Sequence, residues 1–169
     1  MAITIKRDGY GQVEPNHLSA PRDGRVYAQL PAAEDIEILE NGMFVKYDYA
    51  AGEVNFTGDG AWMLVYNEEK LYDERHQMHK DWAQKVEDSY DGKIYPRVFG
   101  IVAGDIITTN TFENNTELAV GDDVTPGEDG FLVAVDAEAE DAPTLVFRVV
   151  KEYTLPDGQP AVKLQCIKA

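Results

Sequence analysis

Short runs of alternating apolar and polar residues, separated by glycine, proline or aspartate, are the feature that most limits how this chain can fold. The clearest runs cover residues 36–40, 43–49, 53–57, 61–66, 95–102 and 105–112. Alternation with a period of two places apolar side chains on one face of a strand and polar side chains on the other. No segment shows the strand-helix alternation of a parallel sheet. The sequence therefore predicts a mainly β fold, a small antiparallel barrel or sandwich.

Two hairpins are predicted within this pattern. Asn41 and Gly42 lie between two strand-like runs, and this pair favours the type I′ turn of a tight hairpin. Near the C-terminus, residues 145–153 and 162–166 alternate on either side of a Pro-Asp-Gly turn. Cys166, the single cysteine, falls on the apolar face of the last run. It cannot form an internal disulfide, and we interpret it as a small buried residue and not as a nucleophile.

Residues 67–90 interrupt the β pattern and are predicted to be a helical or irregular insert. Asn67 could cap a helix, because Glu68 and Glu69 would then lie in its first turn. Apolar residues then recur near one helix face at spacings of seven, four and four: Leu71, Met78, Trp82 and Val86. The alternative is a long, charged excursion between strands.

The first thirty residues show no sustained period and are interpreted as an extended N-terminal arm, with the β domain covering residues 31–169. Five residues break regular structure along this segment: Gly9, Gly11, Pro15, Pro21 and Gly24. The segment is locally basic and also carries tyrosines. Its candidate partner-binding residues are Tyr10, Arg22, Arg25 and Tyr27. A disordered terminus or an N-terminal edge strand is the alternative.

The charge balance argues against nucleic acid as a partner. The chain has 31 acidic and 15 basic residues, a formal net charge of −16, and residues 98–147 contain no lysine, arginine or histidine. Nucleic-acid affinity comes mainly from phosphate neutralisation by basic side chains. The acidic region is either a solvated face or a surface that avoids packaged DNA or docks on a basic partner. Apolar runs are too short to cross a bilayer, so no membrane partner is expected.

Catalytic motifs are not found, and we predict no enzyme activity, catalytic residue, metal site or cofactor. The best enzymatic alternative is a metal site at His76 and His79, which lie three apart and are flanked by acidic residues. Their spacing differs from the His-Glu-x-x-His motif of zinc proteases. The acidic loop at residues 121–130 could be a calcium site, but it lacks the EF-hand pattern and is interpreted as a solvated turn.

Four segments of the sequence resemble segments of head decoration, or cement, proteins of tailed bacteriophages. They are residues 38–45, residues 104–110, residues 120–132, and the closing pair 147–150 with 160–164. The resemblance implies a compact β domain on the outer surface of a viral head. There an arm would bridge major capsid subunits, and the protein would be made in the host cytoplasm. The charged insert is longer than a minimal cement fold requires. It is either a segment that contacts the capsid lattice or evidence against the assignment.

On this resemblance, the expected partner is the major capsid protein, and association into a homo-oligomer is left open. An acidic body is tolerable outside the shell, where it faces solvent and not the genome. The main alternative is another virion or surface binding module, such as a head fibre base or a glycan-binding domain. That alternative predicts an exposed aromatic patch near Trp62 or Trp82.

Overall fold

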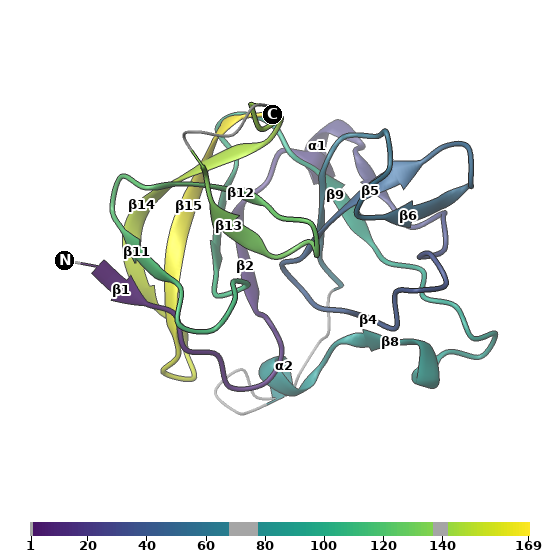
Figure 1. The fold of residues 1–169 in the computed structure, drawn as a ribbon, viewed down its shortest axis with the longest axis horizontal. Helices are drawn as coiled ribbons and strands as arrows, with labels where there is room; N and C mark the ends of the chain where they lie inside the picture. The colour runs from purple at the N-terminus through teal and green to yellow at the C-terminus, as the bar shows by residue number, and fades with distance from the viewer. Residues whose placement is uncertain (1, 68–77, 137–141) are drawn as a thin grey trace.

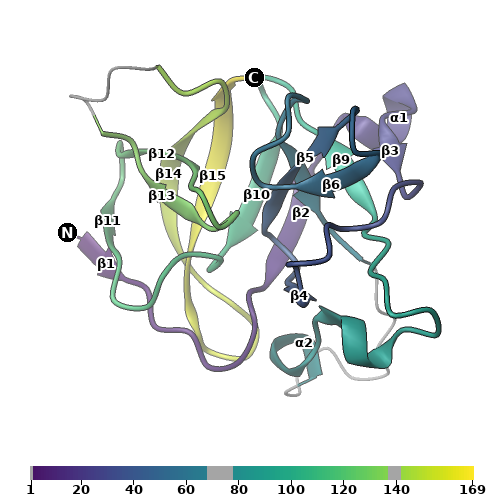
Figure 2. The same ribbon diagram turned by 45° about the vertical axis from the view of Figure 1, so that its right-hand side comes forward.

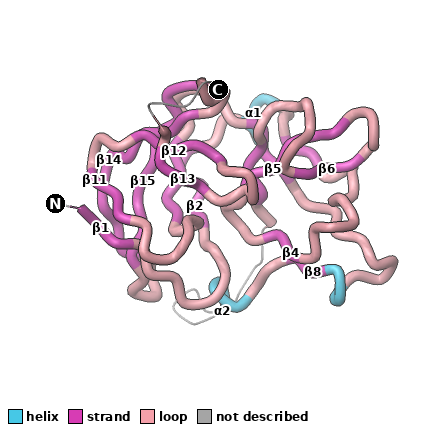
Figure 3. Tube along the Cα trace, in the orientation of Figure 1, coloured by secondary structure: helices cyan, strands magenta, loops and turns pink. Residues whose placement is uncertain are grey.

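Two antiparallel β-sheets, packed face to face, make up most of the protein (Figure 1). The computed structural model describes residues 2–67, 78–136 and 142–169. The prediction of a mainly β fold is confirmed, since helices in these residues are limited to short segments (Figure 3). The arrangement is sandwich-like, and the sheets do not close into a barrel. No helix in the described part of the chain is long and apolar enough to cross a membrane.

The larger sheet has six strands and includes the C-terminal hairpin. In spatial order its strands are β13 (Leu132–Ala134), β12 (Asp123–Pro126), β14 (Val146–Thr154), β15 (Pro160–Lys168), β10 (Ile106–Thr109) and β2 (Val13–His17). Strands β14 and β15 pair with each other, with Phe147 opposite Cys166 and Val149 opposite Leu164. All four of these side chains are buried. The predicted C-terminal hairpin is therefore confirmed, together with its apolar face.

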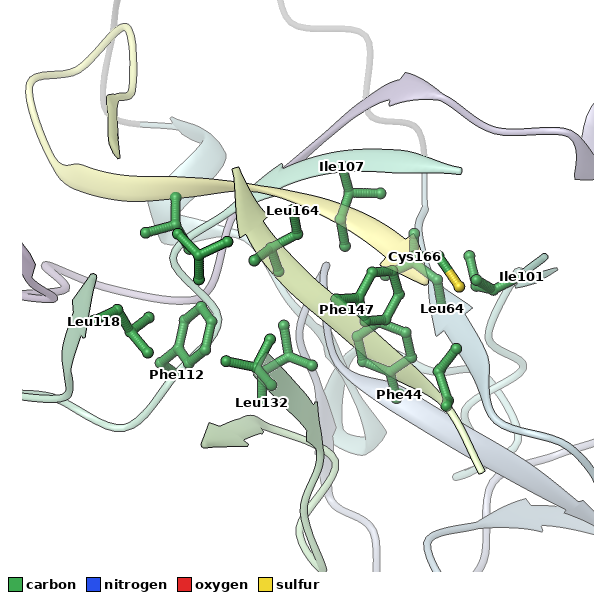
Figure 4. Close-up of a cluster of buried hydrophobic side chains, with 14 of the residues drawn as sticks. Phe44, Leu64, Ile101, Ile107, Phe112, Leu118, Leu132, Phe147, Leu164 and Cys166 are labelled. Atoms are coloured by element: carbon green, nitrogen blue, oxygen red, sulfur yellow. The ribbon is translucent and has the colours of Figure 1, made fainter. Parts of the chain in front are cut away.

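The second sheet has five strands and buries both of its faces. Its spatial order is β3 (Val26–Tyr27), β9 (Val98–Gly100), β7 (Met63–Val65), β5 (Phe44–Asp48) and β6 (Glu53–Asn55). Phe44 points into the inner core between the two sheets, whereas its neighbour Val45 belongs to a separate outer core. Figure 4 shows the inner core, where the rings of Phe44 and Phe147 come from opposite sheets with centroids 5.6 Å apart.

The outer core lies on the far face of the five-stranded sheet and is covered by two loops and a small ladder. Ile36, Leu39 and Ile94 from these covering segments pack against it. The ladder pairs β4 (Ile38–Leu39) with β8 (Gln84–Lys85). A second small ladder, at the other end of the molecule, pairs β1 (Ala2–Thr4) with β11 (Glu117–Ala119).

The predicted hairpin at Asn41 and Gly42 is wrong, although a turn does occur there. The strand before the turn, β4, pairs with β8, and the strand after it, β5, pairs with β6 and β7. Gly42 has a φ of 95°, and a Cβ atom there would lie 2.2 Å from Oγ1 of Thr111. The glycine therefore serves close packing between the sheets as well as the turn.

The structure also corrects the predicted N-terminal arm. Residues 2–27 contribute β1, β2, β3 and the one-turn helix α1 (Ala20–Asp23), and each of the three strands pairs with a strand from later in the chain. Strands β2 and β3 lie at the edges of the two main sheets, as the edge-strand alternative required. Glycines separate these elements, and Pro15 lies within β2, which is possible because β2 is an edge strand.

The predicted insert is described only in part, because residues 68–77, including Leu71, lie outside the described residues. The rest contains α2 (Met78–Asp81), strand β8 and the 3-10 helix η1 (Val86–Asp88). A single helix running through Val86 is wrong, since Gln84 and Lys85 are in extended conformation and pair with β4. The apolar spacing instead reflects contact with the outer core, against which Val86 packs.

Candidate functional site

Helix α1 presents a small basic corner on the surface, and a buried carboxylate holds it in place. Pro21 is in the first turn of α1, and Gly24, with a φ of 68°, ends the helix after one turn. The Ser19 amide and hydroxyl both donate to Oδ1 of Asp105, at 2.8 and 2.7 Å. Asp105 is completely buried, so this contact fixes the helix to the start of strand β10.

Two predicted partner-binding residues, Arg22 and Arg25, share this corner. Arg22 donates to Asp23 at 2.9 Å, and Arg25 lies 3.7 Å from the same carboxylate. The hydrogen bond from Arg22 holds the pKa of Asp23 below its usual value. The side chain of Arg22 remains 76% exposed, so its charge is available to a partner.

A row of three tyrosines continues from the basic corner. The ring of Tyr27 lies 6.0 Å from that of Tyr47, which in turn lies 5.8 Å from that of Tyr49. Desolvation raises the pKa of Tyr47 in the middle, whereas Tyr49 at the end is 68% exposed. Arg22, Arg25 and these three tyrosines form what we term the α1–β3 corner.

Tyr10, the fourth predicted residue, lies away from this corner. Its amide donates to the carbonyl of Lys80 at 2.5 Å. Its ring lies 5.4 Å from the ammonium of Lys85, and its hydroxyl raises the pKa of that lysine. The structure therefore brings three of the four predicted residues together. Tyr10 instead fastens the N-terminal segment to α2 and β8.

A hollow of about 330 Å³ opens on the segment that follows α2. Three aromatic residues line it: Trp82, Tyr90 and Tyr95. Tyr90 is fully exposed, and Tyr95 is 43% exposed. Of the two tryptophans singled out from the sequence, Trp82 therefore lies at an aromatic surface, whereas Trp62 packs against the inner core and under Lys46. Tyr90 and Tyr95 were not predicted from the sequence. Tyr90 lies in a Ser-Tyr-Asp-Gly segment, whose turn residues indicate an exposed position.

Strands β11, β12 and β13, which carry much of the acidic stretch, lie on the left in Figure 2, and α1 lies at the upper right. Exposed carboxylates gather on and beside β11, β12 and β13: Glu113, Glu117, Asp122, Glu128 and Asp129. Strand β14 adds a cation, because Arg148 donates to both oxygens of Asp123 at 2.8 and 2.9 Å. This hydrogen bonding lowers the pKa of Asp123.

The loop that could have been a calcium site uses carboxylates to close turns. Asp122 accepts the amide of Ala119, and Asp129 accepts that of Phe131. No group of three or more possible metal ligands occurs among the residues that the structure describes. His76 and the side chain of His79, the other metal candidates, lie outside the described part.

The thiol of Cys166 is buried in the inner core, and its environment disfavours the thiolate. Desolvation, with a further contribution from the Asp105 carboxylate, raises the pKa of Cys166 from 9.0 to about 11. We expect a thiol reagent at pH 8 to label the folded chain at least about 100-fold more slowly than the urea-unfolded chain, because only the thiolate reacts. Equal labelling rates in the two states would contradict the burial.

Comparison with known proteins finds no matching family model, no matching curated protein and no matching solved structure.

Proposed function

We propose that this protein is a structural component of a tailed-bacteriophage virion that binds the outer surface of the capsid. It would stabilise the shell by bridging major capsid subunits and would act without catalysis. The family in this proposal comes from the resemblance of four β-turn segments of the sequence to cement proteins. The observation that supports it most is the distribution of charge: Arg22 is exposed at the α1–β3 corner, whereas exposed carboxylates lie on and beside β11, β12 and β13.

The folded body itself makes the proposed contact, since residues 2–27 are part of the sheets. The α1–β3 corner offers an exposed cation in Arg22 and an exposed aromatic ring in Tyr49. Such side chains suit a surface contact that needs no pocket, because arginine and tyrosine are enriched at protein interfaces. The acidic end would then face solvent, where its charge disfavours DNA and keeps the particle surface soluble.

Charge reversal at the corner tests this proposal. We expect Arg22→Glu combined with Arg25→Glu to weaken co-sedimentation with heads about 10-fold or more, because both cations would become anions facing the lattice. The experiment first looks for a major capsid gene beside the gene of this chain. Heads assembled from that capsid protein are then used to measure binding across protein concentrations.

Lys6→Glu combined with Lys151→Glu is the matched control. It makes the same change in net charge at two exposed lysines outside the corner. Wild-type affinity is expected for this control. Equal losses in the two double variants would contradict the corner as the contact, and a gene remote from any capsid gene would contradict the virion assignment.

A further inference from the structure

We propose that the hollow lined by Trp82, Tyr90 and Tyr95 is a carbohydrate-binding site that takes an uncharged saccharide. It lies on the segment from Trp82 to Tyr95 and is separate from the α1–β3 corner. The proposal is therefore independent of capsid attachment. It would give the protein a second contact, with a glycan surface.

Exposed aromatic rings are the first observation. Tyr90 is fully exposed on a turn, and Tyr95 is 43% exposed nearby in the same lining. Large aromatic side chains gain free energy from burial, so their gathering around one hollow marks a surface that a ligand can cover. Aromatic ring faces pack well against the C–H faces of sugar rings, which are apolar although the sugar edges carry hydroxyls.

An unpartnered polar atom is the second observation. The side-chain amide of Gln84 donates from Nε2 to the carbonyl of Tyr95 at 3.2 Å, but its Oε1 atom is buried without a hydrogen-bond partner among the described residues. A buried acceptor without a partner costs about 1–3 kcal/mol. Gln84 lines the hollow, so a ligand hydroxyl that reached this buried oxygen after a small shift of the lining would remove that cost.

The other polar groups in the lining are of mixed type. Asp91 accepts a hydrogen bond from the hydroxyl of Tyr95 at 3.3 Å, and Lys93 adds a cationic donor. Donors and acceptors thus lie beside aromatic rings, which matches the hydroxyl-rich edge and apolar face of a saccharide. The lining holds two lysines, Lys85 and Lys93, and two aspartates, Asp88 and Asp91, so neither sign of charge dominates and an uncharged ligand fits best.

The floor of the hollow is held in place before any ligand arrives. Strand β8 is paired with β4, and the amide of Val86 donates to Glu37 at 3.0 Å. On the other side, Ile94 is buried and its carbonyl accepts the amide of Ala32 at 2.7 Å. Fixing both ends of the segment reduces the entropy lost on binding.

The test is a glycan array followed by titration of the oligosaccharide that binds most strongly. Trp82 supplies the signal, because the chain has only two tryptophans and Trp62→Phe leaves Trp82 as the single one. We expect that variant to change its emission on titration, whereas Trp82→Phe should show no change. Tyr90→Ala should weaken binding at least 10-fold without altering thermal unfolding, since its ring is fully exposed.

Tyr49→Ala is the matched control, because Tyr49 is also an exposed tyrosine but lies in the α1–β3 corner. It should bind the oligosaccharide within about twofold of wild type, a change of less than 0.5 kcal/mol by the usual conversion. Absence of array binding, or binding unaffected by Tyr90→Ala, would overturn the proposal. Head co-sedimentation of Tyr90→Ala should be unchanged, which separates this outcome from failure of the virion proposal.

Discussion

Deletion of residues 1–30 is expected to unfold the protein, because this segment supplies strands to three of its ladders. The deletion removes β1, β2, β3 and α1, and with them Ile5 and Ala20, which are completely buried in the inner core. The loss should exceed the 5–15 kcal/mol by which domains of this kind are typically stable. Urea titration followed by circular dichroism should show no cooperative transition, and amide resonances should lose their dispersion.

The double variant Arg22→Glu and Arg25→Glu is the control within the same segment. It changes two charges in and just after α1, where the side chains of Arg22 and Arg25 are 76% and 30% exposed, and it leaves every strand in place. Its unfolding free energy should therefore fall by less than about 1 kcal/mol. A truncated chain that still unfolds cooperatively would contradict the prediction. It would also restore the interpretation of residues 1–30 as an arm separate from the body.

One ion pair explains why the N-terminal segment is part of the body. Arg7 lies 2.6 Å from Glu40, and their side chains are only 13% and 12% exposed. The same glutamate oxygen accepts the amide of Gly11 at 2.5 Å, and the Arg7 guanidinium lies 4.7 Å from the ring centre of Phe131. These partners are distant in sequence, so the sequence does not indicate that they meet. Composition alone therefore predicted a basic arm.

Strand pairings were predictable from the sequence only where the two partner strands are neighbours along the chain. The C-terminal hairpin was predictable because β14 and β15 are adjacent in sequence and in space, and their alternation marks one buried face. The turn at Asn41 and Gly42 has the right residues for a hairpin, yet the flanking strands find partners elsewhere. Turn chemistry indicates where the chain reverses, whereas tertiary packing decides which strands pair.

The candidate surfaces were predictable to different degrees for the same reason. Arg22, Arg25 and Tyr27 lie within six residues of each other, so their grouping followed from local sequence. The contact of Tyr27 with Tyr47 did not, because it depends on how the five-stranded sheet is assembled. The hollow around Tyr90 likewise depends on the pairing of β8 with β4, which the helical interpretation of the insert concealed.

Asp105→Ala is expected to destabilise the protein by about 4 kcal/mol. This completely buried carboxylate accepts the amide and hydroxyl of Ser19 and the amide of Val102, at 2.8, 2.7 and 3.1 Å. Alanine would leave the half-buried backbone amides of Ser19 and Val102 without acceptors, at about 2 kcal/mol each, while the serine hydroxyl could reorient. Urea unfolding monitored by circular dichroism, with an unchanged m-value, measures the loss.

Two further variants separate the buried network from a general effect of losing a carboxylate. Asp105→Asn retains an acceptor for Ser19 but presents an amide group toward the N–H of Val102, so about half of the loss is expected. Asp129→Ala removes an exposed carboxylate whose one hydrogen bond within residues 2–67, 78–136 and 142–169 is from the amide of Phe131, at 3.0 Å, and it should cost less than about 1 kcal/mol. Equal stability losses for Asp105→Ala and Asp129→Ala would contradict the role of Asp105. A larger loss for Asp105→Ala than for Asp105→Asn or Asp129→Ala is the expected result. It would mean that Asp105 holds α1, and with it the α1–β3 corner, against strand β10.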